Sequence, residues 1–217
     1  MKNRWIAGVL AFAAFTGLMT GCGKKDTAES TAETTAPAAV SNTVSDNSFI
    51  ITLYPDVAPI TCENFENLVS QGFYNGLTFH RVIEGFMAQG GDPQGTGMGG
   101  SDQTIKGEFS VNGVENTLSH QRGVVSMARS MDYDSASSQF FICYADCSSL
   151  DGSYAAFGEV TEGMNVVDSF LQVDRAMGGD GAMSAPTKPI IMETVELIDD
   201  DANGNPRVQV TMNDFLS

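Results

Sequence analysis

The sequence predicts a mainly β domain, built as a closed or nearly closed antiparallel barrel. Many short apolar runs of strand length alternate with glycine-rich or polar loops, and only two stretches show helical spacing. Short strands of this kind commonly close on themselves to form a barrel. The composition agrees, because 42% hydrophobic residues in a chain of 217 residues suit one domain with a sizeable core and terminal extensions.

The chain begins with a targeting segment that we expect to lie outside the domain. Lys2 and Arg4 precede an uncharged, mostly apolar run from Trp5 to Met19. This run is shorter than the about 20 residues that a membrane-spanning helix needs, and it suits a secretory signal. The residues from Met19 to Cys22 resemble the bacterial lipobox, in which the cysteine is lipidated and becomes the new N-terminus.

The lipobox resemblance implies two parts before the domain. Residues 1–21 are expected to be a lipoprotein signal peptide, and Cys22 the lipidated residue. The alternative is an ordinary secretory signal in which Cys22 is incidental. Residues 22–47 are rich in Thr, Ala, Glu and Ser and have no hydrophobic period, which is typical of a disordered linker. The resemblance implies an extracytoplasmic protein that is lipid-anchored to the bacterial cell membrane.

The regular elements of the domain are predicted in order from residue 48. Phe49, Ile51 and Leu53 alternate with their neighbours and predict the first strand. Pro59 suits the first turn of a helix, which apolar spacing extends to about Gln71. Further strands are predicted at residues 78–82, 86–90, 124–128, 140–143, 155–160 and 190–198, and a second helix at residues 164–173.

The domain is therefore assigned to residues 48–198, and residues 199–217 to an acidic C-terminal tail. Within this tail, residues 208–212 are compatible with a short extra strand and with a disordered end. The acidic run that starts at Asp199 resembles the beginning of a calcium loop. Val210 stands where such a loop needs a bidentate glutamate, so a solvated turn is expected instead.

The charge and the cysteines exclude other classes of site. A formal charge of −16 argues against nucleic acid as a partner, since phosphate binding needs a basic patch. Cys62, Cys143 and Cys147 remain after the lipobox cysteine; a local Cys143–Cys147 disulfide and buried free thiols both fit the sequence. With two histidines and no Cys-x-x-Cys pair, no metal or cofactor is expected.

The stretch from Phe79 to Asp92 is the most informative part of the chain. Arg81 and Gln89 stand there among aromatic, thioether and glycine residues, without a nucleophile–base pair. Such side chains can orient and polarise an amide but can hardly attack it. The stretch therefore points to a conformational reaction on a peptide.

Further short pieces occur in a fixed order around this stretch: Ala58-Pro59, Asn64-Phe65, Gly72–Tyr74, Phe79–Ile83, Gly85–Pro93, Ser126–Ala128, Ser138–Ile142, Leu150–Gly152 and Phe157-Gly158. Together they resemble the cyclophilin family of peptidyl-prolyl cis/trans isomerases over roughly residues 48–198. The resemblance implies a closed antiparallel eight-stranded β-barrel capped by two α-helices. It also implies an enzyme that accelerates rotation about X–Pro bonds.

The same resemblance implies the site residues. The residues with catalytic roles would be Arg81, Phe86 and Gln89, with Arg81 donating to the prolyl carbonyl. The substrate-binding residues would be Met87, Ala128, Arg129, Gln139, Phe141, Leu150 and Tyr154. No general base is required, because rotation about the imide bond transfers no proton.

Three positions depart from the best-known members of the family. Ser149 stands where many carry a tryptophan, Tyr154 where many carry a histidine, and Arg129 where relatives often have an asparagine. The change at Ser149 removes a large apolar wall and an indole donor. We therefore expect weaker binding of cyclosporin, the inhibitor of the family.

The implied partners are proline-containing polypeptides, among them exported proteins that are unfolded or still folding, and the membrane through the lipid anchor. Nucleic acid is not expected as a partner, and the protein is expected to be a monomer. A second hypothesis is a non-catalytic module that binds proline segments as a holdase, scaffold or adhesin.

Overall fold

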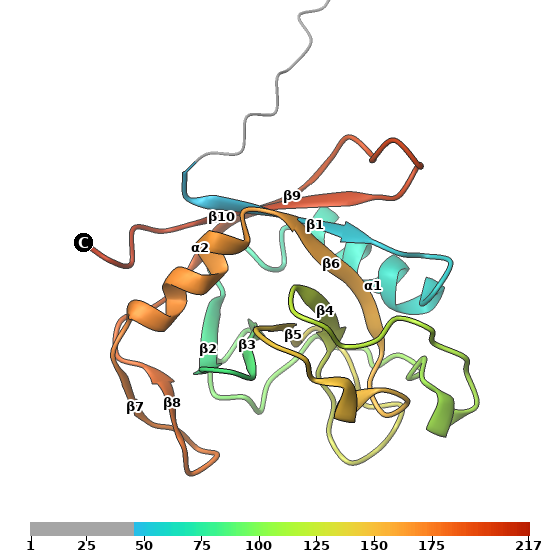
Figure 1. The fold of residues 1–217 in the computed structure, drawn as a ribbon, viewed down its shortest axis with the longest axis horizontal. Helices are drawn as coiled ribbons and strands as arrows, with labels where there is room; N and C mark the ends of the chain where they lie inside the picture. The colour runs from blue at the N-terminus through green and yellow to red at the C-terminus, as the bar shows by residue number, and fades with distance from the viewer. Residues whose placement is uncertain (1–45) are drawn as a thin grey trace, which may run out of the picture. The chain divides into compact units, whose positions relative to one another are not determined.

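The computed structural model describes residues 46–217. The signal peptide, Cys22 and nearly all of the linker predicted before the domain lie outside the described residues. One antiparallel sheet dominates the described part (Figure 1). Its eight strands follow the order β2-β3-β5-β4-β6-β1-β10-β9, and every neighbouring pair is antiparallel. The mainly β fold expected from the sequence is confirmed.

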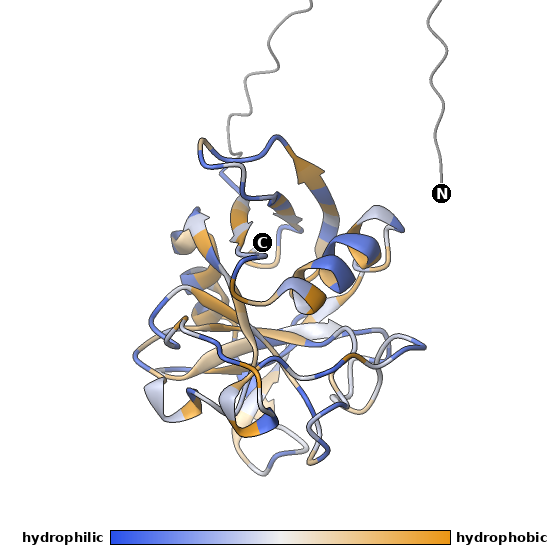
Figure 2. Cartoon of the chain, turned by 90° about the vertical axis from the view of Figure 1, so that its right-hand side faces the viewer, coloured by the Kyte–Doolittle hydropathy of each residue, from blue (hydrophilic) through white to orange (hydrophobic). Residues whose placement is uncertain are grey.

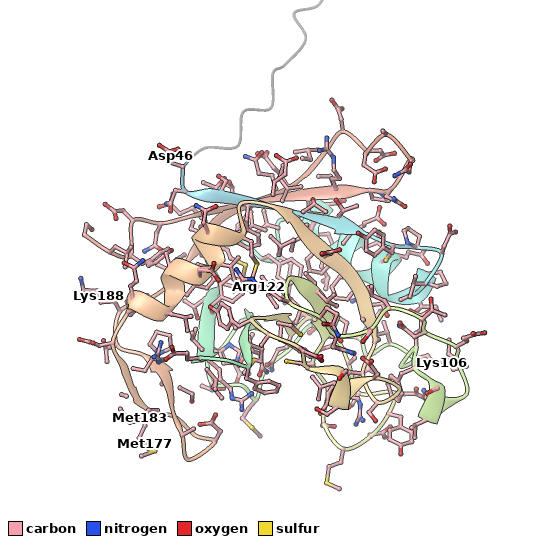
Figure 3. The ribbon with its side chains drawn as sticks, viewed as in Figure 1. Asp46, Lys106, Arg122, Met177, Met183 and Lys188 are labelled. Atoms are coloured by element: carbon pink, nitrogen blue, oxygen red, sulfur yellow. The ribbon has the colours of Figure 1, made fainter. Side chains whose placement is uncertain are left out.

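The strands of this sheet are β1 (Ser48–Leu53), β2 (Thr78–Ile83), β3 (Met87–Asp92), β4 (Val124–Met127), β5 (Phe140–Cys143), β6 (Ala156–Glu162), β9 (Met192–Ile198) and β10 (Arg207–Met212). A separate two-stranded hairpin consists of β7 (Arg175–Met177) and β8 (Met183–Pro186), and it lies against β2. The exposed Met177 and Met183 mark its outer end in Figure 3.

The two predicted helices are present as α1 (Pro59–Ser70) and α2 (Met164–Ser169). The described chain also contains the short 3-10 helices η1 (Ser110–Asn112), η2 (Ser148–Leu150) and η3 (Phe170–Gln172). The carboxylate of Glu108 accepts the amide N–H groups of Ile60 at 3.1 Å and Thr61 at 2.8 Å, so it satisfies free donors in the first turn of α1. Gly72, with φ of 68°, turns the chain away after the helix. Among residues 46–217, no helix is long and apolar enough to cross a membrane.

The prediction of a closed barrel is wrong: the sheet is open, with β2 and β9 as its edges. Among the described residues no strand ladder joins the edges: an isolated bridge between Thr78 and Ile191 and a backbone hydrogen bond from Gly76 to Met192 link them. Pro186 and Pro189, in the chain that leads to β9, have no N–H to donate to a ladder. Strand β9 then runs on beside β10 rather than along β2.

Residues 199–217 were expected to form a tail outside the domain, but the structure places most of this segment in or against the domain. Residues 207–212 form β10, which lies between β1 and β9 within the sheet (Figure 1). The side chains of Val208, Val210 and Met212 are buried, and Phe215 packs edge-to-face on Phe170 with ring centroids 5.4 Å apart. The domain therefore extends well past residue 198, because β10 pairs with β1 on one side and with β9 on the other.

The core lies between the sheet and the helices. Figure 2 shows hydrophobic residues concentrated on the strands, while the loops and outer helix surfaces are largely hydrophilic. Phe65 of α1 lies at the centre of an aromatic cluster, 5.0 Å from Tyr74, 5.4 Å from Phe140 and 5.2 Å from Phe157 between ring centroids. This packing holds α1 against strands that carry the site described below.

The three cysteines of the described domain are free and buried, so the structure favours buried thiols over a local disulfide. Burial raises the pKa of Cys62 to about 12 and also raises that of Cys143. A thiol in such surroundings is a poor nucleophile at neutral pH.

Candidate active site

Three neighbouring strands place two predicted catalytic residues and one predicted substrate-binding residue in register. Arg81 on β2 pairs with Gln89 on β3, and Gln89 pairs with Phe141 on β5. Residues directly opposite each other on adjacent strands share one face of the sheet. Arg81 and Gln89 lie on consecutive strands, 8 positions apart, while a long segment of chain separates them from Phe141; the sheet brings all three to one level.

A cavity of about 180 Å³, with apolar and polar side chains in its lining, opens beside this row. It is lined by Arg81, Phe86, Met87, Gln89, Ala128, Arg129, Phe141, Leu150 and Tyr154. Met87 and Phe141 form its buried floor, and Tyr154 packs edge-to-face on Phe141 at a centroid distance of 5.9 Å. The structure therefore brings together every predicted site residue of the domain except Gln139, which lines an adjoining hollow with Gln89 and Arg129.

The guanidinium of Arg81 lies at the rim of the cavity, with its side chain 31% exposed. Its Nη1 donates to Oε1 of Gln89 at 3.3 Å and lies 4.0 Å from Sδ of Met87. Its Nε donates to Oδ2 of Asp180 at 2.6 Å. Among the described residues Nη2 has no hydrogen-bond acceptor, so this nitrogen is free to donate to a bound molecule.

Two glutamines continue the hydrogen-bond chain away from the arginine. Gln89 donates through Nε2 to Oε1 of Gln139 at 2.8 Å, and Gln139 donates to the carbonyl of Gly99 at 2.7 Å. The chain holds Oε1 of Gln89 toward Arg81. Gln89 therefore links the guanidinium of Arg81 to Gln139.

Arg129 has a structural role that the sequence did not reveal. Its guanidinium donates twice to the carbonyl of Ser153, at 3.0 and 2.8 Å, and lies 4.7 Å from the ring centroid of Tyr154. Cation–π contact and hydrogen bonds together hold Tyr154 at the edge of the cavity. Ser149, by contrast, is exposed in η2 and does not line the cavity.

A serine, a histidine and an aspartate outside the Phe79–Asp92 stretch form a nucleophile–base arrangement beneath the site. Nδ1 of His120 lies 2.7 Å from Oδ1 of Asp151, and Nε2 lies 2.9 Å from Oγ of Ser126. Ser126 and His120 are 0% and 1% exposed, and the His120 ring stacks on Phe141. Because no substrate can reach Ser126, the trio braces the cavity floor and does not perform nucleophilic chemistry.

His80 adjoins Arg81 in sequence but does not line the cavity. Neither of its ring nitrogens, both buried, has a hydrogen-bond partner among residues 46–217. Burial lowers the pKa of His80, so the ring is neutral at physiological pH.

Asp180 is the residue of this site that sequence reasoning missed. It lies 99 positions after Arg81, at the tip of the β7–β8 hairpin, and the Arg81 guanidinium lowers its carboxyl pKa to about 2. The only local signal was a glycine-rich turn. No periodicity or spacing indicates that this turn folds back onto β2.

The arrangement is suited to holding an apolar ring next to a polarised carbonyl. A cation with a free N–H donor stands at the edge of a pocket built from aromatic, aliphatic and thioether groups, where a hydrogen bond is stronger than in water. Within the described residues, no cluster of His, Cys, Asp or Glu has the geometry to hold a metal ion.

Comparison with known proteins agrees with this geometry. Residues 39–197 match the family model described as cyclophilin type peptidyl-prolyl cis-trans isomerase/CLD. The chain is 47% identical over 137 residues to a peptidyl-prolyl cis-trans isomerase of Helicobacter pylori strain J99, covering 61% of this chain and 81% of the relative. It is 48% identical over 128 residues to peptidyl-prolyl cis-trans isomerase B of Bacillus subtilis, covering 59% and 86%.

A solved structure supports the same family. The cyclophilin type peptidyl-prolyl cis-trans isomerase of Cryptosporidium parvum, crystallised in the presence of the dipeptide Ala-Pro, superposes with a TM-score of 0.59. It is 30% identical, and the match covers 66% of this chain and 88% of that chain. The chain thus belongs to the cyclophilin-type peptidyl-prolyl cis-trans isomerases and is an enzyme of that kind.

Proposed function

We propose that this isomerase works outside the cytoplasm as a monomer, anchored by a lipid on Cys22, where it accelerates X–Pro rotation in exported proteins that are folding. The observation that carries the catalytic part is Nη2 of Arg81 at the rim of the cavity, which has no acceptor within residues 46–217. The location rests on the lipobox-like residues up to Cys22 and on the linker composition that follows.

The barrier to the reaction sets what the site must do. An X–Pro bond rotates over about 18–20 kcal/mol because the C–N bond is partly double. A donor that binds the carbonyl more strongly when the bond is twisted lowers this barrier. Nη2 of Arg81 would supply such a donor, while Gln89 and Asp180 hold the guanidinium plane.

The cavity would hold the proline ring while the rest of the peptide turns. Phe86, Met87, Phe141 and Leu150 offer it an apolar enclosure. Gln139 and the backbone around Ala128, beside the cavity, would bind the peptide main chain. The Ala-Pro dipeptide named with the Cryptosporidium parvum structure is a ligand of the size that this cavity suits.

Anchoring outside the cytoplasm would let the enzyme act on a slow step in the folding of exported chains. Uncatalysed proline isomerisation takes tens to hundreds of seconds and limits the folding of many chains. A flexible linker of the length of residues 23–46 spans roughly 25–30 Å, which would keep the domain close to the membrane where exported chains emerge.

Replacing Cys22 with serine is expected to move the protein from the membrane fraction to the soluble fraction. Serine has no thiol to accept the lipid, whereas Cys62→Ser, a substitution at a buried core thiol, leaves the anchor site intact. The measurement is detergent phase partitioning of both variants after expression in bacteria. Membrane retention of the Cys22→Ser protein would show that anchoring does not depend on this residue.

An exported protein whose refolding is limited by one proline is expected to refold faster in the presence of this chain. The same client with that proline replaced should gain nothing, because the slow step is absent. Stopped-flow fluorescence at substoichiometric enzyme measures both rates. A non-catalytic holdase predicts the opposite pattern, in which refolding slows for both clients and the effect needs equimolar protein.

A further inference from the structure

The β7–β8 hairpin contacts the catalytic arginine of the candidate active site through the side chain of Asp180. The hairpin descends beside β2 in Figure 1, and its tip between Met177 and Met183 carries Asp180. Oδ2 of Asp180 accepts the Nε–H of Arg81 at 2.6 Å. The side chains of Arg81 and Asp180 are 31% and 23% exposed, so the ion pair is partly shielded from water.

The hairpin holds the carboxylate of Asp180 in place independently of Arg81. Oδ1 accepts the amide N–H of Ala182 at 3.0 Å and the hydroxyl of Ser184 at 2.7 Å, and Ser184 is 1% exposed. A Cβ at Gly178 would come within 2.3 Å of Oγ of Ser184 and 2.9 Å of Oδ1 of Asp180. The turn therefore has room only for glycine there, and its tight packing fixes the direction in which Oδ2 points.

The bond to Nε determines which nitrogens of Arg81 remain for a substrate. A guanidinium is planar, so acceptors at Nε and Nη1 fix the plane of the whole group. Asp180 holds Nε and Gln89 holds Nη1, while Nη2 has no acceptor among the described residues. Asp180 takes only the Nε–H of Arg81, so the N–H groups of Nη2 remain for a prolyl carbonyl, with no other acceptor among the described residues.

We propose that Asp180 is a positioning residue for isomerisation: its carboxylate, held by the β7–β8 turn, orients the Arg81 guanidinium so that Nη2 faces the substrate carbonyl. This inference rests on the proposed role of Arg81. An isolated surface ion pair would contribute little, but here one partner is anchored by two further hydrogen bonds and the other is the catalytic cation. Asp180 acts through Arg81 and does not touch the substrate.

The Asp180→Asn variant separates the contact with Arg81 from the structure of the turn. A carboxylate has two acceptor oxygens, one for the turn and one for Nε, whereas an asparagine has only one. If its oxygen serves Ala182 and Ser184, its NH2 group faces the Nε–H of Arg81, and two donors oppose each other. The turn then stays intact while the guanidinium loses its orientation.

We expect Asp180→Asn to lower kcat for a proline peptide about tenfold or more, with KM changed by less than about twofold. NMR exchange spectroscopy measures the rates, and thermal unfolding checks the fold. Asp174→Asn is the matched control, because it removes one negative charge beside the same hairpin without a contact to Arg81 and should keep full activity. A wild-type kcat in Asp180→Asn would overturn the inference.

A double-mutant cycle distinguishes positioning from a general effect on structure. In an Arg81→Ala background, Asp180→Asn should cause no further loss, since Asp180 acts only through the guanidinium. Additive losses would overturn the inference while leaving the role of Arg81 intact. If Arg81→Ala alone retains full activity, the proposed role of Arg81 fails first, and the two failures are therefore distinguishable.

Discussion

Replacing Arg81 with alanine is expected to lower kcat/KM for a proline peptide by a factor of about 10²–10³. Alanine removes the donor at the cavity rim that we propose binds the substrate carbonyl. In a partly enclosed apolar site such a donor contributes about 3–4 kcal/mol to transition-state stabilisation. The loss should appear mainly in kcat, because the apolar residues that hold the proline ring remain.

The fold should tolerate this change, so the measurement reports on catalysis. The Arg81 side chain is 31% exposed and forms no part of the hydrophobic core. Arg122→Ala is the matched control: Arg122 (Figure 3) is 48% exposed and pairs with Asp168, away from the cavity. Equal isomerisation rates for wild type and Arg81→Ala, in a protease-free assay, would contradict the assigned role.

Removing residues 199–217 is expected to prevent folding of the domain. The deletion takes away β10 and leaves β1 and β9 with no partner between them. It also removes the buried side chains of Val208, Val210, Met212 and Phe215. At about 1.5–3 kcal/mol for each buried apolar side chain, the loss is about 6–12 kcal/mol, comparable with the whole stability of about 5–15 kcal/mol of a typical domain.

Circular dichroism, thermal unfolding and size-exclusion chromatography of the truncated and intact chains test this expectation. The truncated protein should lack a cooperative transition and should aggregate, because unpaired strand edges associate readily. Removing only Leu216 and Ser217, both exposed, is the control and should leave the melting temperature nearly unchanged. A soluble, cooperatively folding chain that ends at residue 198 would show that β10 is dispensable.

The regular elements with a strong local pattern were predictable from the sequence. The alternation in residues 48–53 and the helical spacing from Pro59 follow from the 2.0 and 3.6 residue periods of strand and helix. Strand β10 was harder to assign to the domain from the sequence, although buried and partly buried residues do alternate along it. It follows an acidic run, and only its pairing with β1, more than 150 residues earlier, makes it part of the domain.

The opening of the sheet could not be inferred from strand count. Enough strands for a barrel are present, but closure depends on whether the two edges meet in register. Here β2 and the chain before β9 share one bridge, at Thr78 and Ile191. This outcome depends on the path of the chain around Pro189, which the sequence pattern does not encode.

The features of the site also divide into those that the sequence predicted and those that only the fold shows. Its residues were identified through resemblance to a known family, and the strand register explains why Arg81, Gln89 and Phe141 meet. The contact with Asp180 and the brace formed by Arg129 depend on loops that fold back onto the site. Such contacts between distant residues leave no local signal in a single sequence.

By itself, the sequence determined that this protein is mainly β and indicated a conformational reaction, because short periods and residue types express local physical preferences. The resemblance to a known family supplied the residues of the cavity. Only the tertiary structure decided that the sheet stays open, that β10 belongs to the domain, and that the guanidinium of Arg81 is held on one side by Asp180. These features depend on how segments far apart in the chain pack and pair, and that packing is a property of the whole fold.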